Sequence, residues 1–248
     1  MLTLPRFFAA TVGLLALLAG TVLTLAVRTA GRAVIQIGEA ARDDRAARVT
    51  KAVERDLGAG ERAVSDFEEA MGAGAIGPAP EIPARDRAGH LLEAFDQGAL
   101  RRYLTAELIA LHSLTDLTLT SGTFERYDED GGMVLAPAGR RQISVFRDAA
   151  GVIKSRVVVD APAGDVTDPT EHDTFRAAAH RDRKGRAIWS DIAFSELDAA
   201  LPEARRRKTM TVQKAIFSAS GAFIGVLRAG IVSDTLERMG LELSLIHI

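Results

Sequence analysis

The strongest pattern near the start of the chain is an uncharged, mostly apolar run over residues 7–27, bounded by Arg6 and Arg28. As an α-helix this run is about 31 Å long, which matches a hydrocarbon core of roughly 30 Å. A secretory signal peptide has a shorter apolar region, of about 7–15 residues, followed by a small-residue cleavage site. We therefore predict an uncleaved transmembrane helix at 7–27 in the lipid bilayer, preceded by a short cytoplasmic N-terminus at 1–6.

The charged residues after this run support two opposite membrane orientations. Arg and Lys residues gather after it, and by the positive-inside rule this favours a cytoplasmic location for the rest of the chain. The rule weakens for long translocated domains, and the acidic residues Glu39, Asp43 and Asp44 lie in the same stretch. We favour an extracytoplasmic, periplasmic location, because of the resemblance described below.

A helical pattern follows the apolar run. Apolar residues recur at gaps of three, four and their multiples from Val34 to Met71, with a mean spacing near 3.6. This predicts a stalk helix over 28–71, about 66 Å long, weakened in its middle by Gly58 and Gly60. Such a helix either pairs with a second copy as a coiled coil or packs along its own domain. We expect a homodimer through the stalk, and both arrangements can hold for different halves of the helix.

A loop and a second helix are predicted next. Residues 72–89 are rich in Gly and Pro, a composition that stops a helix and forms a linker. The stretch from 90 to 112 then carries leucines such as Leu100, Leu104 and Leu108 on one side of a helix.

After residue 112 the pattern changes to that of β-structure. Alternating apolar and β-branched residues predict strands at 114–119, 142–146, 152–159, 187–190, 209–217 and 223–232. A short helix is expected at 173–180. Two of the strand pairs surround turns at Gly151 and Gly221, as hairpins of an antiparallel sheet require. Helices followed by strands predict an α+β domain with a central antiparallel sheet of about five strands.

Composition and motifs exclude several functions. The net charge of −2 argues against a nucleic-acid partner, and the absence of cysteine excludes disulfides, thiolate zinc sites and cysteine nucleophiles. The sequence contains no phosphate-binding loop, nucleophile elbow, zinc-protease helix or calcium-binding loop. We therefore assign no catalytic residue, metal or cofactor. His172 and His180 are expected at the surface, and the basic run 205–208 at a helix end or in solvent.

Two segments carry a resemblance to a known family. Residues 211–231 (TVQKAIFSASGAFIGVLRAGI) resemble the paired strands around a D-x-x-G-x-x-x-G-V-L turn in Cache sensor domains. Residues 186–191 (RAIWSD) place Trp189 where such domains often carry a Trp on the ligand-pocket wall. Together with the order of membrane helix, stalk and sheet, residues 28–237 resemble the double-Cache, PAS-like extracytoplasmic sensor region of bacterial transmembrane receptors. The resemblance implies a Cache-like sensor module at 90–237.

A small-ligand pocket combines aromatic walls with a few converging polar groups. The candidate ligand-binding residues are Trp189, Asp191, Arg176, Tyr103, Gln213 and Arg228. Amino-acid-binding Cache domains use an acid near the last strand and a Tyr beside the Trp. This chain has Gly230 and Ser190 at those positions, which is a departure from that subgroup.

These features predict the input region of a membrane receptor. A ligand bound outside the cell shifts the stalk helix and biases a cytoplasmic output domain, such as a cyclase, phosphatase, kinase or chemoreceptor tail. Residues 243–248 (LSLIHI) resemble the translated end of a transposase adapter used in sequencing libraries, so we expect a non-native tail and an output domain missing from this fragment. The fragment itself is not expected to be an enzyme. The alternatives are a membrane-anchored periplasmic enzyme and a structural dimerisation anchor.

Overall fold

The computed structural model describes residues 4–74, 76, 97–159, 161–164, 168–218 and 221–233. Most of the predicted linker and the whole predicted tail at 243–248 lie outside these residues. The chain divides into two units, and residues 52–242 form the unit that contains all the strands.

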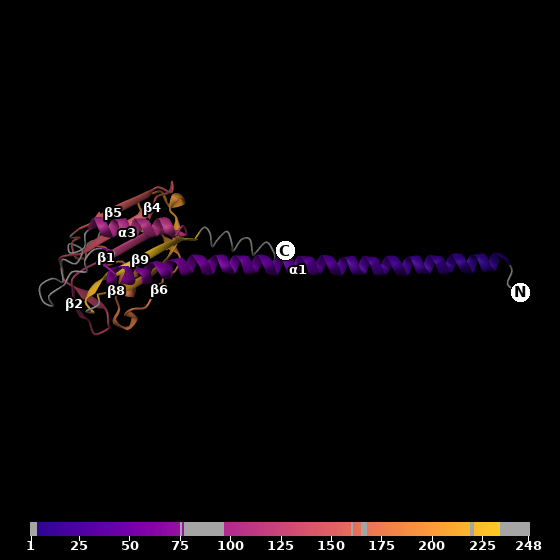
Figure 1. Cartoon of the computed structure of the whole chain (residues 1–248), viewed down its shortest axis with the longest axis horizontal. Coiled ribbons are helices and arrows are strands. Elements are labelled where there is room, and N and C mark those ends of the chain that lie inside the picture. The colour runs from indigo at the N-terminus through magenta and orange to yellow at the C-terminus, as the bar shows by residue number, and fades with distance from the viewer. Residues whose placement is uncertain are drawn as a thin grey trace. The chain divides into compact units, whose positions relative to one another are not determined.

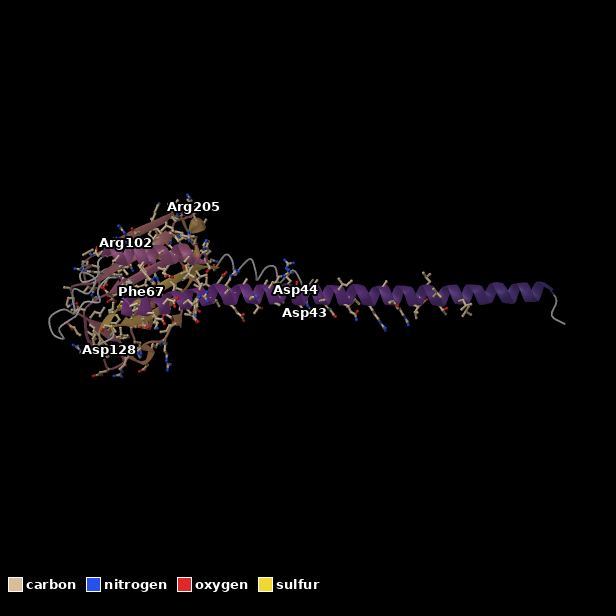
Figure 2. All side chains as sticks on the ribbon, viewed as in Figure 1. Asp43, Asp44, Phe67, Arg102, Asp128 and Arg205 are labelled. Carbon is tan, nitrogen blue, oxygen red and sulfur yellow. The ribbon has the colours of Figure 1, made fainter. Side chains whose placement is uncertain are left out.

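The N-terminal part of the chain is one helix, α1 (Leu4–Gly72), which covers both the predicted membrane helix and the predicted stalk. No helix in the described part of the chain is both long and apolar enough to cross a membrane. The membrane helix expected at 7–27 stays a prediction. Asp43 and Asp44, in the first unit, are exposed, whereas Phe67, in the second unit, is fully buried (Figure 2).

Seven strands form one antiparallel sheet in the order β5-β4-β1-β9-β8-β6, with β7 also paired to β8. The strands are β1 (Leu114–Ser121), β2 (Phe124–Tyr127), β3 (Met133–Leu135), β4 (Arg141–Arg147), β5 (Ile153–Val158), β6 (Ile188–Trp189), β7 (Ala193–Phe194), β8 (Lys208–Phe217) and β9 (Phe223–Val232). The strands β2 and β3 form a separate hairpin. The α+β class and the antiparallel sheet are confirmed, and the five long strands β1, β4, β5, β8 and β9 agree with the expected size. The two-residue strands β6 and β7 make the sheet larger than predicted.

Short helices complete the second unit. The helix α3 (Gln97–Ala110) lies across β4 and β1 (Figure 1). The helix α4 (Asp173–Ala178) packs against β8 and β9. Three single-turn 3-10 helices follow in the chain, and they are η1 (Arg181–Arg183), η2 (Glu196–Asp198) and η3 (Glu203–Arg205).

The two faces of the sheet differ because successive residues of a strand point to opposite sides. One face packs on α3 and on the C-terminal part of α1 and forms the main apolar core. The largest fully buried side chains of this core are Phe67, Ile76, Leu100, Leu104, Leu108, Leu114, Leu117, Leu119, Ile143, Ile216 and Leu227. At Gly60 of α1 a Cβ atom would lie 2.9 Å from Val212 Cγ1 of β8, so a residue without a side chain lets helix and strand approach closely.

The opposite face carries a second, smaller apolar cluster where α4 and the β2–β3 hairpin cover it. Phe175 of α4 packs edge-on against Phe223 of β9, with ring centroids 6.3 Å apart. Ala215 and Val226 from the sheet complete the contact. The rest of this face is polar, and it positions the candidate site.

Candidate functional site: a buried polar face of the sheet

Eight polar side chains lie together on the face of the sheet opposite to α1, and we call this set the polar face. Its members are Asp116, Thr118, Thr120, Gln142, Ser144, Thr211, Gln213 and Arg228. Strand register places them on one side, because residues directly opposite each other on neighbouring strands point to the same face. Thr118 is opposite both Ser144 and Arg228, and Arg228 is opposite Gln213. Seven of the eight are buried, and Gln142 is half-buried.

The neutral members of the polar face are hydrogen-bonded to one another. Thr118 Oγ1 lies 3.1 Å from Ser144 Oγ, and Gln142 Nε2 donates to Thr120 Oγ1 at 3.1 Å. Thr211 Oγ1 donates to Gln213 Oε1 at 3.3 Å. Buried polar groups are nearly always paired, and hydroxyl and amide groups can exchange such internal partners for those of a bound molecule.

The charged centre of the polar face is Arg228, which is 8% exposed. Its guanidinium forms an ion pair with Glu196 of η2 and lies with Nε 3.8 Å from Asp116 Oδ2 of β1. Burial raises the pKa of the Asp116 carboxyl, in spite of the nearby cation. Gly230, opposite Asp116, makes room for this carboxylate, because a Cβ there would overlap Oδ1 and lie 2.9 Å from Cγ.

Residues 195–207, which we call the covering segment, carry two acidic residues that meet arginines. Glu196 pairs with Arg228, while Asp198 accepts hydrogen bonds from Arg207 Nε at 2.7 Å and Nη2 at 2.8 Å. Arg207 Nη1 also donates to the Arg147 carbonyl at 2.6 Å. The hydrogen bonds from Arg207 lower the pKa of Asp198. The expectation of a helix-end or solvated side chain was therefore wrong for Arg207, because a buried carboxylate binds it.

His172 joins the covering segment to α4. Its Nδ1 accepts a hydrogen bond from the Thr174 backbone N–H at 3.3 Å, which caps the start of α4. Since Nδ1 accepts, the neutral ring carries its proton on Nε2, which lies 3.1 Å from Glu196 Oε1. Burial lowers the pKa of His172, and this favours the neutral ring. His180 caps η1 in the same way and directs Nε2 at the Asp130 carbonyl, 2.8 Å away. Within the described residues no three His, Asp or Glu side chains could hold a metal ion.

A hollow of about 370 Å³ lies between α4 and the β2–β3 hairpin. Its charged lining includes Arg140, Glu171 and Arg176. Arg140 forms an ion pair with Asp168 and a 2.9 Å hydrogen bond to Thr170 Oγ1, and Arg176 forms an ion pair with Glu171. Each of these cations is therefore paired with an acidic neighbour.

The structure brings two of the six sequence-predicted ligand residues together, Gln213 and Arg228, on the polar face. Trp189 lies on the other side of the sheet, because it pairs with Val212, which packs against α1. Trp189 Nε1 donates to Glu61 Oε1 of α1 at 3.0 Å.

The remaining three predicted residues lie elsewhere. The Tyr103 ring stands edge-on to Phe67 of α1, with centroids 5.8 Å apart, in the core on the helix side. Arg176 lines the hollow beneath α4, and Asp191 is exposed after β6.

Sequence reasoning missed Asp116, Thr118, Ser144 and Glu196. The available indication was in β1, where polar residues alternate with Leu117 and Leu119, but only the structure shows that this strand is buried at every position. Alternation in a strand covered on both faces points to a polar interior surface rather than to solvent.

No protein-family model and no curated protein matches the sequence. Among solved structures, the chain is similar to the ligand-binding domain of the Pseudomonas aeruginosa PAO1 amino acid chemoreceptor PctC in complex with GABA. The identity is 12%, the match covers 78% of this chain and 60% of that chain, and the TM-score is 0.40. The ligand-binding domain of the Campylobacter jejuni chemoreceptor Tlp3 in complex with L-norvaline matches at 14% identity, over 82% and 62% of the two chains, with a TM-score of 0.41.

The extracellular domain of the histidine kinase soHK1S-Z6 matches at 16% identity, over 79% and 65% of the two chains, with a TM-score of 0.37. These structural neighbours are thus ligand-binding or extracellular domains of chemoreceptors and of a histidine kinase. The chain spans 60–65% of the length of the three structures.

Proposed function

We propose that this chain is the small-ligand-sensing input region of a membrane-bound signalling receptor, with the polar face as its ligand site. The observation that carries the proposal is the division of one sheet into two faces. Buried hydrogen-bonding groups gather on one face, and the long helix α1 packs on the other. A sensor needs this combination, because it must bind a molecule and move an element that leaves the domain.

The polar face supplies the recognition. Gln213 and Arg228 offer an amide and a guanidinium, and the hydroxyls of Thr118 and Ser144 lie beside them. A ligand that enters replaces their internal hydrogen bonds with its own, so specificity comes from matching donors and acceptors in a buried setting. We propose small polar molecules as the ligand class.

The residues on either side of Gln213 in β8 contact α1, and we propose that they transmit the signal. Gln213 of β8 faces the ligand side, while its neighbour Lys214 reaches α1 and its Nζ lies 2.6 Å from Glu68 Oε2. Val212, on the other side of Gln213, packs at Gly60 of α1. A small displacement of β8 therefore reaches the helix directly, provided that the ligand binds two positions of the strand with different affinities. We assign Trp189 to this helix-side contact.

The uncharged run at 7–27 supports a membrane anchor, and with it a single-pass arrangement in the cell membrane with the sensor module outside the cytoplasm. The continuous helix α1 supports transmission towards the membrane. We propose that the exposed half of the predicted stalk at 28–71 pairs with a second copy, and that a cytoplasmic output domain receives the signal.

A thermal-shift screen of the full chain, purified with detergent present, tests the proposal. At least one compound in a panel of amines, carboxylates, purines and sugars is expected to raise the melting temperature by several degrees. Gln213→Leu should abolish that shift. Gln97→Leu is the matched control, because Gln97 is exposed at the start of α3, and it should keep the shift.

The alternative functions give different results. A blank across the panel, with a dimer still formed, would favour a structural anchor. Turnover of a compound instead of simple binding would favour a tethered enzyme. A shift that survives Gln213→Leu would place the ligand away from the polar face.

A further inference from the structure

Arg228 is a buried cation whose two nearest acidic neighbours differ in kind. It emerges from β9 between neutral partners, Thr118 on one side and Gln213 on the other. One acidic neighbour, Asp116, belongs to the sheet itself, whereas the other, Glu196, belongs to the covering segment. Arg228 becomes free for a ligand more or less easily, depending on which of these two carboxylates is hydrogen-bonded to its guanidinium.

Asp116 lies close to the guanidinium but beyond hydrogen-bond distance of Nε. Its carboxylate stays 3.8 Å from Arg228 Nε, and among the described residues Nε finds no hydrogen-bond acceptor. Burial also raises the pKa of Asp116, because its charged form is disfavoured away from water. The direct bond to the guanidinium comes from Glu196 Oε1 to Nη1.

Glu196 is placed where it can leave. Its side chain is 37% exposed, so its carboxylate can turn into water, giving up Arg228 Nη1 and His172 Nε2, without the burial penalty that holds Asp116 in place. It sits on the single-turn helix η2, preceded by the exposed residues Ile192 and Phe194. The neighbouring bidentate pair of Asp198 with Arg207 lies within the covering segment, and Arg207 Nη1 also donates to the Arg147 carbonyl of β4 at 2.6 Å, which anchors the segment without Glu196. Release of Glu196 therefore does not require the segment to detach.

We propose that Glu196 is a built-in competitor for the ligand: a carboxylate-bearing small molecule takes its place on Arg228 and frees the first turn of the covering segment. The inference rests on the proposed function and specifies the chemistry of its site. A carboxylate fits because it reproduces the geometry of the group it replaces, with two oxygens for the guanidinium fork. Release of Glu196 frees Nη1 for one oxygen of the ligand, and Nη2 lies beside Nη1 in the same fork for the second oxygen.

Competition of this kind lowers the apparent affinity by the fraction of molecules in which Arg228 is free. If Glu196 leaves Arg228 free in about one molecule in ten, a carboxylate binds about tenfold more weakly than it would to an open site. Removing the charge at residue 196 should recover most of that factor. A purely structural ion pair predicts the opposite, because its loss loosens the site and weakens binding.

The experiment is titration calorimetry on the full chain with defined probes: acetate, propionate, butyrate, lactate, glycine and L-alanine, each beside its primary amide. The test variant is Glu196→Gln. The control is Glu203→Gln, which removes the same charge from an exposed position of the same segment. A third protein, Arg228→Met with Asp116→Asn, removes the cation without leaving a buried carboxylate unpaired.

The inference expects Glu196→Gln to bind at least one acid about tenfold more tightly than the wild type. Glu203→Gln should match the wild type, the amides should fail to bind, and the Arg228→Met protein should lose the acid. Equal or weaker binding by Glu196→Gln, equal binding of acid and amide, or no acid bound by Glu196→Gln would each overturn it. If no acid binds but the wild-type chain binds a non-acidic compound through Gln213, the role of Glu196 as a competitor is refuted and the proposed function stands. The proposed function fails only when the wider panel of compounds is also blank.

Discussion

The close contact between Gly230 of β9 and Asp116 of β1 gives a sharp test of the polar face. The two residues are directly opposite each other in the sheet. A Cβ at position 230 would overlap Asp116 Oδ1, and it would lie 2.9 Å from Cγ and 3.1 Å from Thr115 Oγ1. Gly230→Ala therefore forces a buried carboxylate to move, and it does so without altering any other charge.

The expected size follows from two opposing effects. Replacing Gly by Ala in a strand gains about 0.5–1 kcal/mol when the site has room. Overpacking a buried site costs about 1–3 kcal/mol. We expect a net loss of about 1–2 kcal/mol for Gly230→Ala, since Asp116 is held between the strand and Arg228. In an Asp116→Ala background the overlap with the carboxylate disappears and the 3.1 Å contact with Thr115 Oγ1 remains, so the same change should be neutral or stabilise the protein by up to about 1 kcal/mol.

Urea unfolding of the four proteins in this double-mutant cycle measures the coupling. Thermal midpoints offer a second readout, at about 2–4 °C per kcal/mol for a domain of 150–250 residues. Gly225→Ala is the control, because its Cβ would lie 2.5 Å from the backbone oxygen of Thr120 and loss of Asp116 cannot relieve that contact. If Gly230→Ala costs the same with and without the Asp116 carboxylate, the assigned packing of the polar face is wrong.

Three further predictions concern the groups around the sheet. Burial raises the pKa of Glu107, so the charged form of this side chain reduces the free energy of unfolding as the pH rises above about 4.3. In urea titrations between pH 4 and 7, Glu107→Gln should therefore lose less free energy of unfolding than the wild type. Arg207 lowers the pKa of Asp198, so this pair stabilises the fold at neutral pH and is lost as the pH falls below about 3.9; Asp198→Asn should cost about 3 kcal/mol at pH 7 by urea unfolding. Trp189→Phe should cost about 1 kcal/mol through the lost bond to Glu61, and Glu61→Gln should shift the emission of this single tryptophan.

Much of the fold could be predicted from local pattern. The last strand was expected at 223–232 and β9 has those bounds, because its apolar run starts after a glycine turn and stays uninterrupted. The hairpin β2–β3 was missed, since Phe124–Tyr127 mixes aromatic with charged residues and shows no clear alternation. The strand β7 was missed because two residues, Ala193 and Phe194, carry too little pattern to recognise.

The candidate site could be predicted only in part, because register joins residues that are far apart in the sequence. Gln213 and Arg228 stood out as polar groups inside apolar strands, and β8 and β9 are neighbours in the chain as well as in the sheet. The pairing of β1 with β9 brings Asp116 beside Arg228, although more than a hundred residues separate them in the sequence. No local sequence pattern predicts this pairing. The side on which Trp189 lies depends likewise on its pairing with Val212.

The polar face is difficult to explain as a device for stability. Replacing a buried ion pair by well-packed apolar residues is often neutral or stabilising, and replacing both partners of a buried hydroxyl pair can be nearly neutral. The other face of the same strands shows that this chain can build an apolar layer there, with Leu117 and Leu119 alternating with Thr118. A sheet that serves only as a scaffold for α1 gains nothing from Arg228 at its centre, held by a half-exposed Glu196. A sheet that must exchange internal partners for those of a ligand needs such groups, and it needs them one residue away from the helix that carries the response.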